Sequence, residues 1–439
     1  MTENEQTWLI RGADLVGQGR SDVLIRQGRI AEIGTRLSAA GASIVEAEGL
    51  VWLPGLVDLH THLREPGRED AETVLSGTQA AARGGYTAVC AMANSQPVAD
   101  TAGVVEQVWR LGKEAGFADV QPIGAVSVGL QGETMAELGA MASSASQVRM
   151  FSDDGHCVSD SQLMRRALEY VKTFDGLIAQ HAEDPRLTED AQMHEGDWSS
   201  QLGLTGWPSV AEEAIIARDV LLADYVGSRV HFCHVSTAGS VEIIAAAKRK
   251  GINITAEVCP HHLLLTDEKV ASFDPVFKVN PPLRESSDVA ALRTALADGT
   301  IDVVATDHAP HAAQDKVCEW GLARPGMLGL ETALSITVEA LGGPNSVDWD
   351  LVAERCSRAP ARISGLTDHG HDPVVGVSAN FTLVDPTGQW TVEPDGLSSI
   401  ARNTPFAGME LATTVQSTFL RGRATVLDGK LNDPTQEAI

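Results

Sequence analysis

VDLHTHLREPG, residues 57 to 67, places His60 and His62 one residue apart directly after an apolar run. In a β-strand, residues i, i+2 and i+4 share one face, so His60, His62 and Arg64 are expected to point into one cavity. An isolated HxH pair is also found by accident or on a surface. Its meaning therefore depends on the partners that the rest of the chain supplies.

From Leu56 onward, short apolar runs alternate with amphipathic stretches. We predict strands at residues 57–62, 86–93, 119–127, 148–155, 177–184, 229–236, 252–260 and 301–310. Helix-like segments such as 72–85, 159–174, 209–227 and 237–251 lie between them. Eight strands of parallel type with intervening helices predict an α/β fold, a (β/α)8 TIM-type barrel over residues 56–365, rather than an open sheet.

Both ends of the chain have strand-like sequence. Residues 1–55 are β-branched, punctuated by glycine and free of helical periodicity, and residues 366–439 return to the same pattern after the barrel. The simplest packing brings these two parts together in one small β-sandwich domain, which also keeps the termini close.

Composition and charge restrict the functional classes. A formal net charge of −26 argues against nucleic acid and anionic membrane as partners, because both present negative charge. No apolar segment approaches the roughly 20 residues of a membrane span, and the N-terminus MTENEQTW does not resemble a signal peptide. The six cysteines are scattered without a CxxC pair, which is typical of free thiols in a reducing cytoplasm. We therefore expect a cytoplasmic protein.

Residues with metal-binding side chains lie at the ends of the predicted strands. With His60 and His62 the set comprises Asp154, His181, His234 and Asp307. The carboxyl ends of barrel strands converge on one face, where active sites are built. Alone, a strand-end aspartate can cap the next helix and a histidine can be a core residue. Together, six such residues predict a site for one or two divalent ions, and two ions bridged by a carboxylate would suit water activation.

The motifs VDLHTHLREPG, FSDDG, AQHAED, HVST, NPPLR and ATDHAPH, in this order, resemble the cyclic amidohydrolases of the amidohydrolase superfamily. Among these, the chain is most similar to bacterial class I dihydroorotases over nearly its whole length. The resemblance implies that His60 and His62 hold the more buried metal and that Asp154 bridges two metals. It implies further that His181 and His234 bind the second metal, and that Asp307 contacts the first metal and is the catalytic acid–base.

The same resemblance implies the reaction and the substrate contacts. Dihydroorotases interconvert N-carbamoyl-L-aspartate and L-dihydroorotate in de novo pyrimidine biosynthesis. A metal-bound hydroxide attacks the ring amide, and Asp307 would move the proton to the leaving nitrogen. Zinc is the expected metal, although the ligand types also suit manganese or cobalt. The groups expected to grip the substrate are Arg64, Asn94, Asn280 and His311, with the Arg64 guanidinium facing a carboxylate; a salt bridge is the alternative for Arg64 and a turn for the asparagines.

Two rival functions remain. Hydantoinases, dihydropyrimidinases and allantoinases share the barrel and the HxH pair, but they typically bridge their metals with a carboxylated lysine. Here Asp154 stands at that position, and Lys172 lies well down the following helix. A catalytically silent paralogue that serves a transcarbamoylase would be expected to have lost metal ligands, and this chain keeps all six.

Further predictions concern the assembly, the residues that orient the ligands, a histidine pair and one loop. A homo-oligomer and a complex with aspartate transcarbamoylase are expected from the resemblance. His308 and Asp58 are candidates for orienting the metal ligands, whereas the pair His261 and His262 is interpreted as structural. Residues 312–326, which follow Asp307, are interpreted as a lid or a partner-binding loop.

Overall fold

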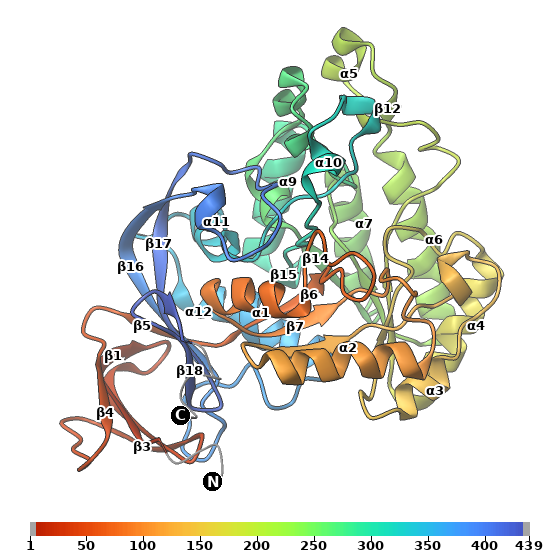
Figure 1. Ribbon diagram of the computed structural model, residues 1–439. Helices are drawn as coiled ribbons and strands as arrows, with labels where there is room; N and C mark the ends of the chain where they lie inside the picture. Colours follow the sequence, from red (N-terminus) through yellow and green to blue (C-terminus); the bar gives the residue numbers. More distant parts are fainter. Residues whose placement is uncertain (1–5, 433–439) are drawn as a thin grey trace.

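The computed structural model describes residues 6–432 and contains a central set of parallel strands surrounded by helices (Figure 1). Eight short strands follow the predicted order, each within or next to its predicted range. They are β6 (Leu56–Thr61), β7 (Tyr86–Ala91), β8 (Asp119–Pro122), β9 (Met150–Phe151), β10 (Leu177–Gln180), β13 (Val230–Phe232), β14 (Ile254–Val258) and β15 (Val303–Val304).

The eight strands close into a barrel. Strands β6, β7 and β8 pair in parallel as one group, and β9, β10, β13, β14 and β15 pair in parallel as another. Isolated parallel bridges join the groups at both edges, one between Gly124 and Phe151 and one between Thr61 and His308. The strand order therefore returns to its start, as the predicted barrel fold requires.

Helices cover the outside of the barrel. Their bounds are α1 (Val74–Arg83), α2 (Ala102–Ala115), α3 (Leu138–Ser143), α4 (Ser161–Val171), α6 (Val210–Val226), α7 (Ala238–Arg249), α9 (Ser286–Asp298), α11 (Ala333–Ala340), α12 (Trp349–Ala353) and α13 (Ala359–Ser364). In α4 the buried side chains recur at the helical spacing, from Leu163 through Ala167 to Val171, and Asp160 caps the first turn by accepting from Leu163 N. Such faces pack against the strands and exclude water from the barrel wall.

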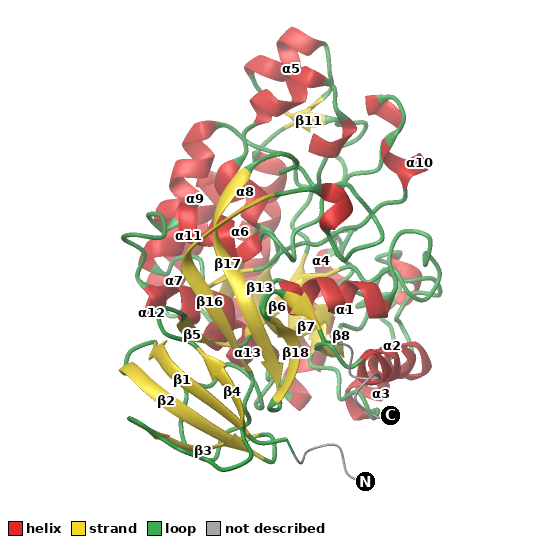
Figure 2. Cartoon of the chain, turned by 60° about the vertical axis from the view of Figure 1, so that its left-hand side comes forward, coloured by secondary structure: helices red, strands yellow, loops and turns green. Residues whose placement is uncertain are grey.

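Short elements inserted after the strands build up the carboxyl end of the barrel. They are β11 (Met193–His194), α5 (Asp197–Leu202), β12 (Gly206–Trp207), α8 (Pro260–Leu264) and α10 (Ala313–Lys316). Figures 1 and 2 both show α5 at one extreme of the molecule, away from the chain-end sheet. Active sites of such barrels lie at this end of the strands.

Both chain ends join one sheet. Its strands are β1 (Trp8–Leu15), β2 (Gly19–Arg26), β3 (Arg29–Gly34), β4 (Ser43–Glu46), β5 (Val51–Pro54), β16 (Phe381–Thr391), β17 (Glu410–Leu420), β18 (Arg423–Leu427) and β19 (Lys430–Leu431). The antiparallel pairing of β5 with β16 connects the two ends of the chain. The predicted sandwich is thus built from a single nine-stranded sheet.

This sheet folds back on itself around its own hydrophobic core. Trp8 on β1 packs edge-on against Phe419 on β17 with ring centroids 5.2 Å apart, although these strands are not neighbours in the sheet. An isolated bridge between Arg29 and Ser378 brings β3 back to the C-terminal part. The division into domains at residues 55/56 and 365/366 stays a prediction.

A partly buried carboxylate links the barrel to the chain-end sheet. Asp119, at the start of β8, accepts from His369 Nε2 at 2.9 Å and from Arg421 Nη1 at 3.2 Å. Burial alone would raise the pKa of Asp119, but His369 and Arg421 outweigh it and hold this pKa well below its usual range. The link is therefore an ionised one, made between residues far apart in the chain.

We expect Asp119→Asn to lower the free energy of unfolding by about 2 kcal/mol at neutral pH, because it removes charge-assisted hydrogen bonds. A depressed carboxyl pKa stabilises the fold above the unfolded-state pKa of about 3.9, and this contribution is lost as pH falls toward the folded-state pKa. Urea unfolding of both proteins at several pH values measures the difference. A difference that does not shrink below about pH 4 would contradict this assignment.

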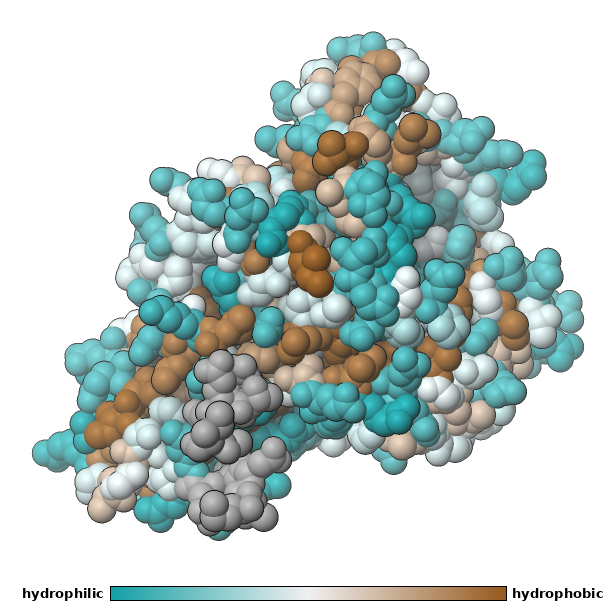
Figure 3. All heavy atoms as spheres, viewed as in Figure 1, coloured by the Kyte–Doolittle hydropathy of each residue, from teal (hydrophilic) through white to brown (hydrophobic). Residues whose placement is uncertain are grey.

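Figure 3 shows hydrophilic residues interspersed with hydrophobic ones over the visible face. Within residues 6–432, none of the helices combines the length and the hydropathy needed to cross a membrane.

Candidate metal centre

The six predicted ligands converge at the carboxyl end of the barrel. Asp154, which follows β9, lies at the centre: its Oδ1 is 3.3 Å from His60 Nε2, from His181 Nδ1 and from His234 Nε2. Its Oδ2 is 3.4 Å from His62 Nε2. All of these side chains are buried. A single carboxylate thus faces four imidazoles that come from three strand ends, those of β6, β10 and β13.

Asp307 closes the cluster from the end of β15. Its Oδ1 lies 3.0 Å from His62 Nε2 and 3.5 Å from His60 Nε2. The structure therefore brings together the HxH pair and both aspartates, as well as His181 and His234 across the barrel mouth.

Hydrogen bonds at the outer ring nitrogens orient three of the histidines. His60 Nδ1 donates to Glu257 Oε1 at 2.6 Å, and His62 Nδ1 donates to Asn94 Oδ1 at 2.9 Å. His181 Nε2 donates to Glu183 Oε2 at 2.8 Å. A proton on each outer nitrogen leaves the inner nitrogen with a free lone pair when the ring is neutral. Metal-binding histidines are held in this way.

A nitrogen atom without a hydrogen-bond partner indicates that a metal fits this cluster. His60 Nε2 is buried and has no hydrogen-bond partner within residues 6–432, although Asp154 and Asp307 lie on either side of it. A buried polar atom without a partner is costly, and a cation bound there would satisfy it. Three groups of ligand atoms share His60, and within each the atoms lie within 4.8 Å of one another. Two of them contain only predicted ligands, one with Asp154 and His234 and one with His62 and Asp307, and the third contains Cys233 and Glu257. The imidazole and carboxylate donors suit one or two divalent ions.

The electrostatics of the cluster favour positive charge. Burial opposes protonation of His60, yet the Asp154 and Glu257 carboxylates raise the pKa of His60 well above its usual range. Burial likewise opposes protonation of His181, but Asp154 and Glu183 raise the pKa of His181 to about 10. The carboxylates thus pull cationic charge onto His60 and His181, and bound metal ions would supply that charge instead.

The backbone is held in an unusual conformation at two of the ligands. His234 and Asp307 have φ angles of 33° and 45°, in the left-handed region that non-glycine residues rarely adopt. Such conformations persist only where surrounding contacts impose them, and they are concentrated at functional sites. Here they aim two strand-end side chains back into the barrel mouth.

Arg64 reaches the site by a different route from the predicted one. Strand β6 ends at Thr61, and Arg64 has a φ of 60°, so the expectation that it shares a strand face with the two histidines is wrong. Its Nε donates to Pro310 O at 2.9 Å, which is its one side-chain hydrogen bond among the described residues. Burial lowers the pKa of Arg64 to about 10, against the opposing charge of Asp307, so the guanidinium remains charged at neutral pH. Its remaining N–H groups can receive an anionic ligand.

The two predicted asparagines differ in what they have left to offer. Asn94 is already engaged, because it accepts from His62 and its Nδ2 donates to Asp154 O at 3.3 Å. Asn280 donates from Nδ2 to Glu183 Oε2 at 3.3 Å, whereas its Oδ1 is buried without a hydrogen-bond partner. Asn280 therefore keeps a free acceptor, and Asn94 acts on His62. Both substrate contacts stay predictions.

His311 stands against the segment that follows it. Its Nε2 donates to Pro325 O at 2.8 Å, and burial together with the charge of Arg64 lowers its pKa to about 2, so the ring is neutral. Gly326 packs against this ring: with φ at 142°, a Cβ there would lie 2.7 Å from His311 Nε2. Glycine is thus required at the point where residues 312–326 return to the site.

Two carboxylates of the site were missed by the sequence interpretation. Glu257, on β14, binds His60, accepts from His231 Nε2 at 2.9 Å, and accepts from His234 N at 3.2 Å. Glu183 bridges His181 and Asn280. A glutamate inside an apolar strand, as in ITAEVCP, is rarely buried without a partner. That pattern was a usable signal for Glu257, and the spacing His181–Glu183 was one for the second carboxylate.

The two candidates for orienting the ligands behave differently. Asp58 accepts from His60 N at 3.2 Å and from Thr306 N at 2.9 Å, so it ties β6 to β15 beside both Asp307 and the HxH pair. His308 turns away, and its Nε2 lies 3.3 Å from Glu72 Oε2. Asp58 therefore has the side-chain contacts of a positioning residue, whereas His308 contacts the HxH pair through its backbone, where its carbonyl oxygen accepts from His62 N at 2.9 Å.

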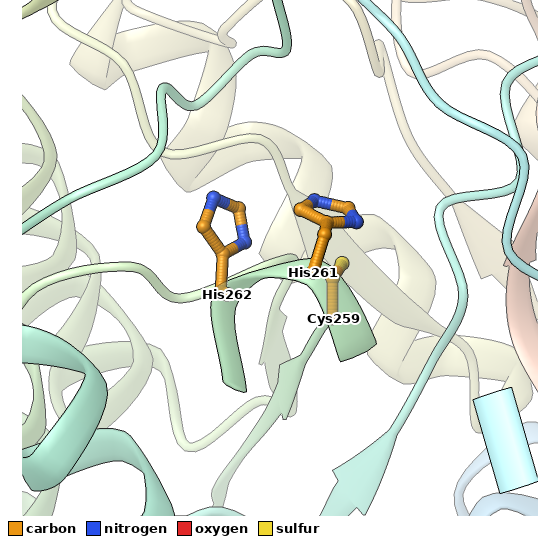
Figure 4. A group of neighbouring side chains, drawn as sticks. All are labelled: Cys259, His261 and His262. Carbon is orange, nitrogen blue, oxygen red and sulfur yellow. The ribbon is translucent and has the colours of Figure 1, made fainter. Parts of the chain in front are cut away.

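A second group of metal-binding side chains, separate in membership from the six ligands, lies at the end of β14. Cys259, His261 and His262 offer ligand atoms within 4.8 Å of one another, and all three are buried (Figure 4). Burial lowers the pKa of His261 to about 4 and that of His262 well below its usual range, so both rings are neutral.

Comparison with known proteins places these residues in a family. The model of a family described as dihydro-orotase-like matches residues 49–240. A protein of Streptomyces coelicolor named dihydroorotase is 64% identical over 423 residues, which are 96% of this chain and 99% of that protein. One of Mycobacterium tuberculosis, also named dihydroorotase, is 56% identical over 425 residues, covering 96% and 99% of the two chains.

Solved structures with the same fold are cyclic amidohydrolases of other specificity. The L-hydantoinase of Arthrobacter aurescens superposes with a TM-score of 0.85 at 23% identity, over 98% of this chain and 97% of that one. The dihydropyrimidinase of Brevibacillus agri gives a TM-score of 0.83 at 24% identity, over 97% and 96%. At this identity the likeness extends to the fold alone.

Proposed function

The chain belongs to the dihydroorotase family, and on that premise we propose that its barrel face interconverts N-carbamoyl-L-aspartate and L-dihydroorotate in de novo pyrimidine biosynthesis. We propose zinc as the metal, with one or two ions per subunit. His60, His62 and Asp307 would hold the first ion, and His181 and His234 the second, with Asp154 between them.

Among enzymes with this fold, one observation supports dihydroorotase rather than hydantoinase activity. Asp154 itself reaches three of the histidines at 3.3 Å. Hydantoinase-type relatives are expected to use a carboxylated lysine at this position. The alternative lysine, Lys172, instead donates to Val226 O at 2.9 Å on the outside of the barrel. A short carboxylate in place of the lysine favours dihydroorotase chemistry.

Opening of the ring requires an activated water and a proton carrier. When bound, the metal ions supply a more acidic water and polarise the amide carbonyl. Asp307 supplies the proton carrier. Burial alone would raise the pKa of Asp307, but the neighbouring His62 and His60 outweigh it and hold this pKa well below its usual range. The carboxylate is therefore ionised and ready to accept a proton from water.

The proton then moves to the leaving group. As the bond between the carbonyl carbon and the ring nitrogen breaks, Asp307 returns the proton to that nitrogen, which completes N-carbamoyl-L-aspartate. Ring closure follows the same steps in reverse. The position of Asp307, buried 3.0 Å from His62 Nε2, keeps its carboxylate on the edge of the cluster where it can serve both steps.

Substrate recognition is assigned to Arg64, Asn280, His311 and Asn94. Arg64 presents its free N–H groups to the substrate carboxylate, a charge-assisted contact that suits a planar guanidinium. Asn280 Oδ1 accepts from a substrate N–H, and the neutral His311 lines the same side. Residues 312–326 follow His311 and are tied to the body of the protein, since Asp315 Oδ2 accepts from Arg68 Nη2 at 2.5 Å.

The proposal extends to the setting of the enzyme. A cytoplasmic location is part of it because of the scattered cysteines, and a homo-oligomer and a complex with aspartate transcarbamoylase are part of it because of the family resemblance. The small-molecule substrate follows from the enzymatic function itself.

A substrate panel tests the proposed function. We expect purified protein, with its metal content measured on the same sample, to open L-dihydroorotate and to leave hydantoin, dihydrouracil and allantoin unchanged. Chelation is expected to abolish turnover, because both the acidic water and the polarised carbonyl depend on the metals. Preference for hydantoin or dihydrouracil would refute the assignment of Arg64 as carboxylate anchor. Absence of all turnover in a fully metallated sample would refute the assignment of activity to the isolated chain.

A further inference from the structure

The turn between β14 and α8 gathers three side chains that the catalytic centre does not use. Cys259 precedes α8, Pro260 begins the helix, and His261 and His262 lie in its first turn. Their exposed fractions are 0%, 2% and 1%. The imidazole centroids are 4.4 Å apart and the rings are tilted by 54°. Figure 4 shows the thiol of Cys259 beneath the ring of His261, with His262 standing beside them.

Two nitrogens of this group lack partners. His262 Nε2 lies 3.1 Å from Pro281 O, and because a carbonyl only accepts, this nitrogen carries the proton. His262 Nδ1 therefore presents a lone pair, and it is buried without a hydrogen-bond partner among the described residues. His261 Nε2 is buried without a partner as well. Native proteins rarely leave one such atom unsatisfied, and here two adjacent residues each leave one.

The chemistry of the three donors selects the occupant. One thiol and two imidazoles are the donor set of zinc and related borderline ions, whereas magnesium and calcium require oxygen ligands. The Asp307 and Glu257 carboxylates act electrostatically on the Cys259 sulfur and would favour a bound cation, whereas His60 acts in the opposite direction.

We propose that Cys259, His261 and His262 bind one zinc-class divalent cation, distinct from the ions of the catalytic centre. On binding, the Cys259 thiol releases its proton to solvent and the sulfur becomes a ligand as thiolate. Three protein ligands leave one of the four tetrahedral positions for water. The ion joins the end of β14 to the Pro281 loop through His262, and it thereby fixes the segment that also carries Asn280.

Cobalt provides the test, because a thiolate bound to Co²⁺ gives a charge-transfer band in the near ultraviolet. None of the six ligands of the proposed catalytic centre is a thiol, so that centre contributes nothing to the band. We expect the wild-type protein, produced with Co²⁺ as the metal supplied, to show the band. We expect Cys259→Ser to lose it and to contain one equivalent of cobalt less per chain.

Cys233→Ser is the matched control. Cys233 is another buried thiol, and it lies with His60 and Glu257 in a group whose ligand atoms are within 4.8 Å of one another. Cobalt bound there would also give a thiolate band, so Cys233→Ser must keep the band if the proposal is right. His262→Ala is expected to lower the cobalt content as Cys259→Ser does. Circular dichroism and thermal unfolding check that each variant is folded.

Three results would overturn the proposal: a wild-type protein without the band, a band that persists in Cys259→Ser, or equal cobalt content in wild type and Cys259→Ser. These readouts do not depend on turnover. Failure of the dihydroorotate assay with a band present would therefore refute the proposed function and leave the Cys259 site standing, and the reverse result would do the opposite.

Discussion

Asp307→Asn is expected to lower kcat for L-dihydroorotate by about 10²- to 10⁴-fold, the range that positioned acid–base groups contribute. The substitution keeps the size of the side chain but removes its ability to accept and return a proton. The carboxylate is buried, and the His62 contact holds the pKa of Asp307 well below its usual range, so the proton-accepting form dominates at neutral pH in the wild type. An amide in this place has no comparable basicity.

The measurement is steady-state ring opening, with total metal determined on the same preparation. Asp302→Asn is the matched control, because Asp302 belongs to the other end of the same barrel segment, where it accepts from Lys248 Nζ at 2.6 Å and from Ala256 N at 2.8 Å. We expect this variant to keep its kcat. If Asp307→Asn retains both its metal and a wild-type kcat, Asp307 is not the proton carrier.

Asp154→Ala is expected to release metal and to reduce activity by more than about 100-fold, which exceeds the usual cost of removing a partner outside the ligand shell. Asp154 is the residue that approaches His60, His181 and His234 together, at 3.3 Å each. Without it the histidines lose the charge that draws cations to the centre. Metal content and turnover should therefore fall together, and both should recover poorly with added zinc.

The neighbouring aspartate of the SDD motif serves as the control. Asp153 is also buried, but its Oδ1 accepts from Val126 N at 2.8 Å and from Ser127 N at 2.9 Å, away from the histidines. We expect Asp153→Asn to change stability while metal content per folded chain stays the same. Full metal content in Asp154→Ala would show that this residue does not bridge the centre.

The convergence of the six candidate ligands could be predicted because of where they occur in the pattern. A parallel barrel places every strand end on one face, so the positions of Asp154, His181, His234 and Asp307 after apolar runs were sufficient to bring them near His60. This convergence depends only on the direction and order of the strands, and both can be inferred from the apolar periodicity of the sequence.

The partners of those ligands could not be predicted in the same way. Glu257 is 197 residues from His60 in the chain, and their 2.6 Å contact depends on how two non-adjacent strands pack across the barrel. The prediction for Arg64 was wrong for a local reason. Strand β6 ends at Thr61, and the left-handed backbone conformation of Arg64 itself redirects its side chain. The single continuous sheet of the chain ends likewise depends on β5 pairing with β16.

By itself, the sequence determined the barrel, the meeting of the two chain ends and the ligand positions, because strand order and apolar periodicity are local properties of the chain. Tertiary structure decided which nitrogen of His60 faces Asp154, why Asn94 is held by His62, and which atoms of His261 and His262 remain unsatisfied. The physical reason is that the direction of a hydrogen bond depends on partners brought together only when the barrel closes.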